Sequence, residues 1–137
     1  MKIENEFIPY EQALALKELG FNEECFRVKL KKSPEQWYTQ TDYEDYPEQK
    51  EEEVLIPLWQ QAFDWFREKY GIIGNVNDNC ILENTYSISI SKIFDSRILY
   101  VNGRNHNLKD KQGFTTYEEA ELECLKKLIE IVKNGKK

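Results

Sequence analysis

The chain has few of the residues from which catalytic and metal sites are usually built. Among its 137 residues there is one histidine, His106, and there are three cysteines, Cys25, Cys80 and Cys124. An odd and scattered set of thiols argues against a disulfide framework and against a four-ligand zinc site, and it fits reduced cytosolic cysteines. The isolated glycines do not form a phosphate-binding loop. We therefore expect no cofactor, no metal and no enzymatic activity.

Long apolar runs are also missing. No stretch reaches the roughly 20 residues of a membrane-spanning helix, and residues 1–6 lack the basic and apolar regions of a signal peptide. We expect a cytoplasmic protein with no membrane contact. A chain of this length, 40% hydrophobic and 32% charged, can bury a core without disulfides or metal. The expected organisation is a single domain over residues 1–137.

Aromatic residues are abundant. Residues 57–71 carry five apolar side chains, four of them aromatic, at helical spacing. This spacing predicts a helix with one apolar face. Pro57 is suited to the beginning of the helix and Gly71 to its end. Such a face either belongs to the core or binds a ligand, and we favour the core because large exposed apolar patches are rare. The face consists of Trp59, Ala62, Phe63, Phe66 and Tyr70.

Further elements follow from periodicity and turn signals. We expect a first helix within residues 7–20, and a last helix that begins with a capping box at Thr116 and ends near Gly135. Tyr117 is expected on the buried face of that last helix. Strands are expected at residues 25–32, 72–76, 85–93 and 98–101, with turns at 77–79 and 94–97. The fold class is α+β: an antiparallel sheet of three or four strands, packed by two main helices, with a short N-terminal helix.

The strand at residues 25–32 alternates, with Phe26, Val28 and Leu30 on one side. Arg27, Lys29 and Lys31 form the other side, which we expect to be a solvated basic face.

Residues 33–56 form the least regular stretch, and we expect an acidic aromatic loop or insertion there. From Ser33 to Pro57 there are eight acids and one base, which gives this stretch a net charge of −7. The whole chain has a net charge of −6, so the remaining residues sum to +1. A long charged loop that also carries aromatic side chains is a candidate for binding a protein partner. The candidate partner-binding residues are Trp37, Tyr38, Tyr43, Glu44, Asp45 and Tyr46.

Three stretches carry a resemblance to a family. Residues 9–13 (PYEQA), 62–70 (AFDWFREKY) and 116–122 (TYEEAEL) resemble short proteins of gut Bacteroidetes and their phages. The resemblance covers about half the chain. It implies a phage or mobile-element setting, and it implies no activity, because no function is assigned to that family.

From Pro57 onward, the expected order of helix, three strands and helix is similar to that of double-stranded-RNA-binding domains. In that family a lysine cluster at the beginning of the last helix grips phosphates. The matching positions here hold Glu118, Glu119 and Glu121. The resemblance therefore implies the fold without the binding charges, and binding of nucleic acid is not favoured.

Three functions remain open. The favoured one is a non-enzymatic module that binds an unknown protein partner through the acidic aromatic segment. The alternative is a nucleic-acid-binding domain, and the third is an enzyme of unrecognised type. The nucleic-acid hypothesis would use Lys29, Lys31, Lys32 and Arg104.

Overall fold

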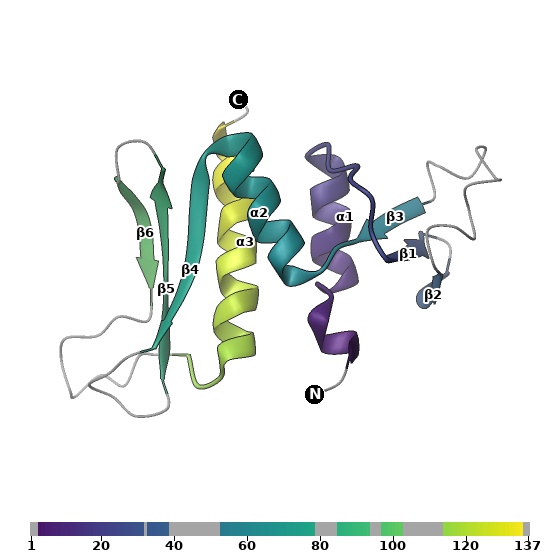
Figure 1. Cartoon of the computed structure of the whole chain (residues 1–137), viewed down its shortest axis with the longest axis horizontal. Coiled ribbons are helices and arrows are strands. Elements are labelled where there is room, and N and C mark those ends of the chain that lie inside the picture. The colour runs from purple at the N-terminus through teal and green to yellow at the C-terminus, as the bar shows by residue number, and fades with distance from the viewer. Residues whose placement is uncertain are drawn as a thin grey trace. The chain divides into compact units, whose positions relative to one another are not determined.

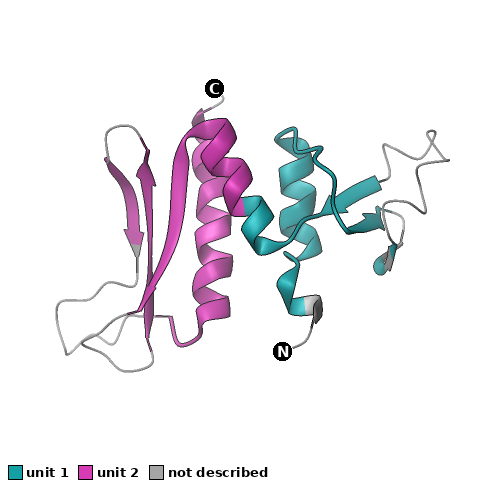
Figure 2. Cartoon of the chain, in the orientation of Figure 1, with its two compact units in different colours: residues 1–62 teal, residues 63–137 magenta. Residues whose placement is uncertain are grey.

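The computed structural model describes residues 3–31, 33–38, 53–78, 85–93, 97–102 and 114–135. The described chain separates into two compact units, residues 1–62 and residues 63–137 (Figure 2). The expectation of a single domain stays a prediction. The α+β class is confirmed, because three α-helices accompany two antiparallel sheets. The sequence predicted one sheet, whereas the described strands are divided between two.

Unit 1 contains a short sheet and the first helices (Figure 1). In the sheet β1 is central, β2 and β3 flank it, and both pairings are antiparallel. Helix α1 packs against β3. Pro9 caps the beginning of α1, and Gly20, with φ of 102°, follows its end in the left-handed conformation that glycine tolerates. The elements are η1 (Ile3–Glu6), α1 (Tyr10–Glu18), β1 (Arg27–Leu30), β2 (Ser33–Tyr38), β3 (Glu53–Ile56) and the start of α2 (Trp59–Tyr70).

Unit 2 begins within α2 and holds the second sheet, β4–β5–β6, which is antiparallel throughout. Helix α3 packs along β4 and β5 (Figure 1). The strand predicted for residues 85–93 is confirmed, and Ile88 and Ile90 are buried as the alternation predicted. The alternation is not complete, because Ser87 is also buried and Tyr86 is only half-buried. The strands and the helix are β4 (Ile72–Asp78), β5 (Tyr86–Lys92), β6 (Ile98–Asn102) and α3 (Tyr117–Gly135).

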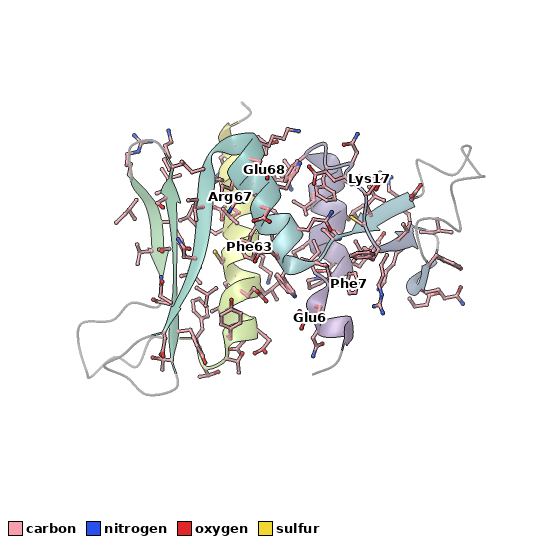
Figure 3. All side chains as sticks on the ribbon, in the orientation of Figure 1. Glu6, Phe7, Lys17, Phe63, Arg67 and Glu68 are labelled. Carbon is pink, nitrogen blue, oxygen red and sulfur yellow. The ribbon has the colours of Figure 1, made fainter. Side chains whose placement is uncertain are left out.

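The helices of unit 2 approach the sheet closely at Gly74 on β4. A Cβ atom at this position would lie 2.8 Å from Cys124 Sγ and 3.0 Å from Leu128 Cδ1, both on α3. It would also lie 3.1 Å from Cε1 of Phe63, on α2 (labelled in Figure 3). Both helices therefore cover the same face of the sheet, and only a residue without a side chain fits between them and β4.

The apolar stripe predicted for α2 is buried in part, since Trp59, Phe63 and Tyr70 are only half-buried. Ala62 and Phe66 are fully buried. Trp65, which the predicted stripe left out, is 5% exposed and packs edge-on against Phe66 with the ring centroids 5.1 Å apart. The predicted helix end is confirmed, because Gly71 follows α2 with φ of 67°.

Several boundaries predicted from turn chemistry are wrong. Residues 33–38 and 53–56, expected to be part of a loop, are strands that pair with β1. Asn77 and Asp78, expected in a turn, pair with Ser87 and Tyr86 as the end of β4. The sheet partners override the local turn preference of these residues. The expected turn at residues 94–97 falls largely outside the described residues.

Tyr117 and Phe26 were predicted to be buried, and they are 47% and 74% exposed. Phe26 lies just before β1, and Tyr117 is the first residue of α3, where its ring packs edge-on against that of Tyr86 with the centroids 5.9 Å apart. The capping role of Thr116 is confirmed, since its hydroxyl accepts a hydrogen bond from the Glu119 N–H at 3.1 Å. The Glu119 carboxylate accepts a hydrogen bond from the Thr115 hydroxyl at 3.0 Å.

Replacing Gly74 by alanine should destabilise the protein by about 1–3 kcal/mol, because the added methyl group would overpack the contact with Cys124, Leu128 and Phe63. The matched control is Gly135→Ala, where nothing lies within 4 Å of the new Cβ atom. Chemical denaturation measures both. Adding Cys124→Ala to Gly74→Ala should recover part of the loss, and equal effects of the two glycine variants would contradict this packing.

Candidate functional site

The acidic aromatic segment begins with β2, which is an edge strand of the sheet in unit 1. The register of β1 with β2 pairs Tyr38 with Val28 and Trp37 with Lys29, at the last two positions of β2. Tyr38 is half-buried, and its hydroxyl donates a hydrogen bond to Gln36 Oε1 at 2.7 Å. Two of the six candidate residues therefore belong to β2, where successive positions face opposite sides of the sheet. Tyr43, Glu44, Asp45 and Tyr46 lie outside the described residues.

The two ends of this segment are held on opposite sides of β1. Because β2 and β3 are both antiparallel to β1, they run parallel to each other with β1 between them. The chain ends β2 beside Val28 and begins β3 at Glu53, beside Leu30. The backbone oxygen of Glu53 accepts a hydrogen bond from Lys17 Nζ of α1. The beginning of β3 is thereby fixed to the first helix.

The expected solvated basic face of β1 is not what the structure shows. Arg27 and Lys29 are half-buried, and they pair with Ile56 and Val54, which are buried. Directly opposed residues share a face, so the face of Arg27 and Lys29 also carries the buried residues Ile56 and Val54 of β3 and is partly covered. Arg27 also places its guanidinium carbon 4.4 Å from the centre of the Phe7 ring (Phe7 is labelled in Figure 3).

The other residues of the nucleic-acid hypothesis are not gathered into one patch by the described structure. Lys31 is exposed after β1, whereas Lys32 and Arg104 lie outside the described residues. At the beginning of α3, Glu118 and Glu119 are exposed, as the sequence indicated. Burial, followed by the neighbouring Glu121 carboxylate, raises the pKa of the Tyr117 hydroxyl there.

Two of the three thiols are buried. Burial, with a smaller effect of Glu23, raises the pKa of Cys25 to about 12, although a hydrogen bond with Gln61 opposes the shift. Burial, with a smaller effect of Glu121, raises the pKa of Cys124 to about 12, and a hydrogen bond with the Asn75 backbone opposes it. A thiol with a raised pKa forms little thiolate, so neither residue is suited to nucleophilic catalysis. Cys80 and His106 lie outside the described residues.

Within the described ranges, no group of three or more histidine, cysteine, aspartate or glutamate side chains is arranged to hold a metal ion. None of the described helices has the length and apolar character needed to cross a membrane.

Comparison of the chain with protein-family models, with curated proteins and with solved structures finds no match. The resemblances drawn from the sequence stay expectations, and functional inference depends on the geometry of this chain.

Sequence reasoning did not identify the exposed apolar residues outside the acidic segment. Ile98 and Val101 on β6 are 62% and 38% exposed, and Phe26 beside β1 is 74% exposed. Alternation alone made Ile98 and Val101 look like ordinary strand residues. The signal that could have found them is the lack of any charged residue from Ile98 to Asn102.

In a Cys80→Ser variant, which retains Cys25 and Cys124, the native protein at pH 8 should react with a thiol reagent about a hundredfold or more slowly than the unfolded chain. The reason is that burial keeps both thiols protonated. Both thiols have a higher pKa in the folded protein than in the unfolded chain. Their protonation therefore stabilises the folded state fully below about pH 8.5, and this stabilisation is lost as the pH rises toward 12. Equal labelling rates with and without denaturant would refute the assignment.

Proposed function

We propose that this protein is a non-enzymatic interaction module of a phage or mobile element, and that it binds another protein through the segment between β2 and β3. The observation that carries the proposal is the position of Trp37 and Tyr38 at the end of an edge strand. These aromatic residues adjoin the most acidic part of the chain, and the sheet anchors that part at both ends.

Charge defines the kind of partner. The acidic side chains of the segment favour water and repel one another, while its aromatic side chains gain by leaving water. A basic protein surface satisfies both, because it neutralises the carboxylates and covers the aromatic rings. The remainder of the chain has a net charge of +1, so the attraction for a basic partner is concentrated in this segment.

Binding of nucleic acid is the second candidate. The specific observation in its favour is the order α2–β4–β5–β6–α3, with an antiparallel three-stranded sheet. The exposed Glu118 and Glu119 at the beginning of α3 oppose it, because phosphate binding requires clustered lysine and arginine. We therefore rank this candidate below a protein partner.

The decisive experiment replaces residues 40–51 by a Gly-Ser linker of equal length and leaves β2 and β3 intact. We expect the thermal unfolding of this variant to match that of the parent chain, because no described strand is removed. Affinity capture from the native host, with mass spectrometry, should recover a basic protein with the parent chain and lose it with the linker variant. Purified partner should bind more weakly as salt is raised.

Two matched variants separate charge from aromatic contact. The double variant Glu44→Gln with Asp45→Asn removes negative charge and keeps the aromatic rings. The double variant Tyr43→Ser with Tyr46→Ser removes two rings and keeps the charge. Each double variant should weaken binding of the partner. A partner retained by the linker variant, or a linker variant that no longer folds, would contradict the proposal. Tight binding of the parent chain to duplex RNA that weakens steeply with salt would favour the second candidate instead.

A further inference from the structure

Among the described strands of unit 2, β6 forms an edge of the sheet. It pairs with β5 on one side, and the sheet order β4–β5–β6 ends with it. An edge strand presents backbone N–H and C=O groups that a further strand can pair with. Edge strands are commonly protected against such pairing by proline, by charged side chains, by bulges or by short length.

Compared with the other described edge strands, β6 lacks the chemical protection. Strand β2 contains Pro34 and Glu35, β3 contains Glu53, and β4 ends with Asp78. Strand β6 has the sequence ILYVN, with no proline and no side chain that is charged at neutral pH. Its protection is limited to its length of five residues and to a bulge near its beginning.

The exposed apolar side chains of β6 lie on one face. Val101 pairs with Ser89 and Ile98 pairs with Ser91, on the face opposite to buried Ile88 and Ile90. The bulge inserts Leu99 as an extra residue, so Ile98 and Val101 share a face although they are three positions apart. The helices cover the other face, where Lys127 of α3 lies 4.4 Å from the Tyr100 ring centre. Figure 1 shows the described helices of unit 2 on one side of the β4–β5–β6 sheet and no described element of this unit on the other side.

We infer that β6 is the contact surface for a second copy of this chain, paired antiparallel to it across a two-fold axis between Leu99 and Tyr100. This register sets Ile98 opposite Val101 of the second copy, and the symmetry repeats the pair. Directly opposed side chains have Cβ atoms about 4.5–5.5 Å apart, close enough for apolar contact. The strand is therefore complementary to itself, which is the requirement for a two-fold interface.

Charge and chain geometry are consistent with a second copy of the chain at β6. The strand brings no like charges together, since Arg97, just before β6, would stand opposite Asn102 of the second copy. The other edge of the sheet, β4, carries Asn75, Asn77 and Asp78, which do not favour continued pairing. Assembly through β6 therefore closes at two copies and does not extend into a fibre.

The interface is small and the copies repel each other. Five paired residues on each side bury less than the roughly 1,200 Å² at the lower end of standard interfaces, so we expect a dissociation constant of about micromolar order. Each copy has a net charge of −6. Added salt shortens the Debye length from about 30 Å at 0.01 M to about 8 Å at 0.15 M, so salt should favour the dimer.

Sedimentation equilibrium of the full chain over a range of concentrations tests this inference, which does not depend on the proposed function. The parent chain should reach twice the monomer mass at high concentration, with the association tightening as salt rises. Ile98→Lys should remain folded, because Ile98 is 62% exposed, and should weaken association at least tenfold. The matched control is Phe26→Lys, which changes an even more exposed apolar side chain outside β6 and should leave association unchanged.

Disulfide trapping tests the register. In a Cys80→Ser background, Ile98→Cys chains mixed with Val101→Cys chains should form a covalent dimer on mild oxidation, faster than either variant alone. A monomeric parent chain at all concentrations would overturn the inference. So would a dimer that Ile98→Lys leaves intact, or one that Phe26→Lys disperses.

Discussion

Burial of the aromatic side chains of α2 is the constraint on which unit 2 depends. Phe66 is fully buried, Trp65 nearly so, and the rings of Trp65, Phe66 and Tyr70 contact one another with centroids 5.1–6.1 Å apart. Side chains of this size supply much of the apolar area that a small unit can remove from water. Helices α2 and α3 meet the same face of β4 at Gly74, where Phe63, Cys124 and Leu128 leave no room for a side chain. The fully buried part of the aromatic stripe is consequently not available as a ligand surface.

The sequence predicted well those elements whose signal is local. Period-2 alternation located β5, Gly20 and Gly71 marked the ends of α1 and α2, and the Thr116 cap located α3. It failed where tertiary pairing decides. Asn77 and Asp78 have turn propensity, yet the opposing residues of β5 hold them in a strand. Arg27 and Lys29 alternate like a solvated face, yet both are half-buried opposite buried residues of β3. Membership of one sheet or of two depends on which strands pair, and periodicity carries no information about that choice.

The composition of the candidate site could be predicted from the sequence, but its strand boundaries could not. The charge imbalance identified the acidic aromatic segment, but it did not show that Trp37 and Tyr38 belong to strand β2, or that β3 begins at Glu53. The edge of β6 could not be read from the sequence, because a strand becomes an edge only through its neighbours. The sequence does show that β6 has no proline and no charged residue, unlike β2, β3 and β4. This difference can be interpreted only once the strand order is known. The two surfaces lie in different units, and each has its own chemistry: carboxylates with aromatic rings in unit 1, and uncharged apolar side chains in unit 2.

The central claim is that the aromatic face of α2 is core, so that function lies elsewhere on the molecule. The most direct test is the stability of Phe66→Ala, measured by chemical denaturation with a circular-dichroism readout. Because Phe66 is fully buried, the substitution should lower the free energy of unfolding by about 3–5 kcal/mol. Arg67→Ala, at the exposed neighbouring position (Arg67 is labelled in Figure 3), should change it by less than about 0.5 kcal/mol. A loss of less than about 1 kcal/mol for Phe66→Ala would place the aromatic face in solvent and contradict the architecture.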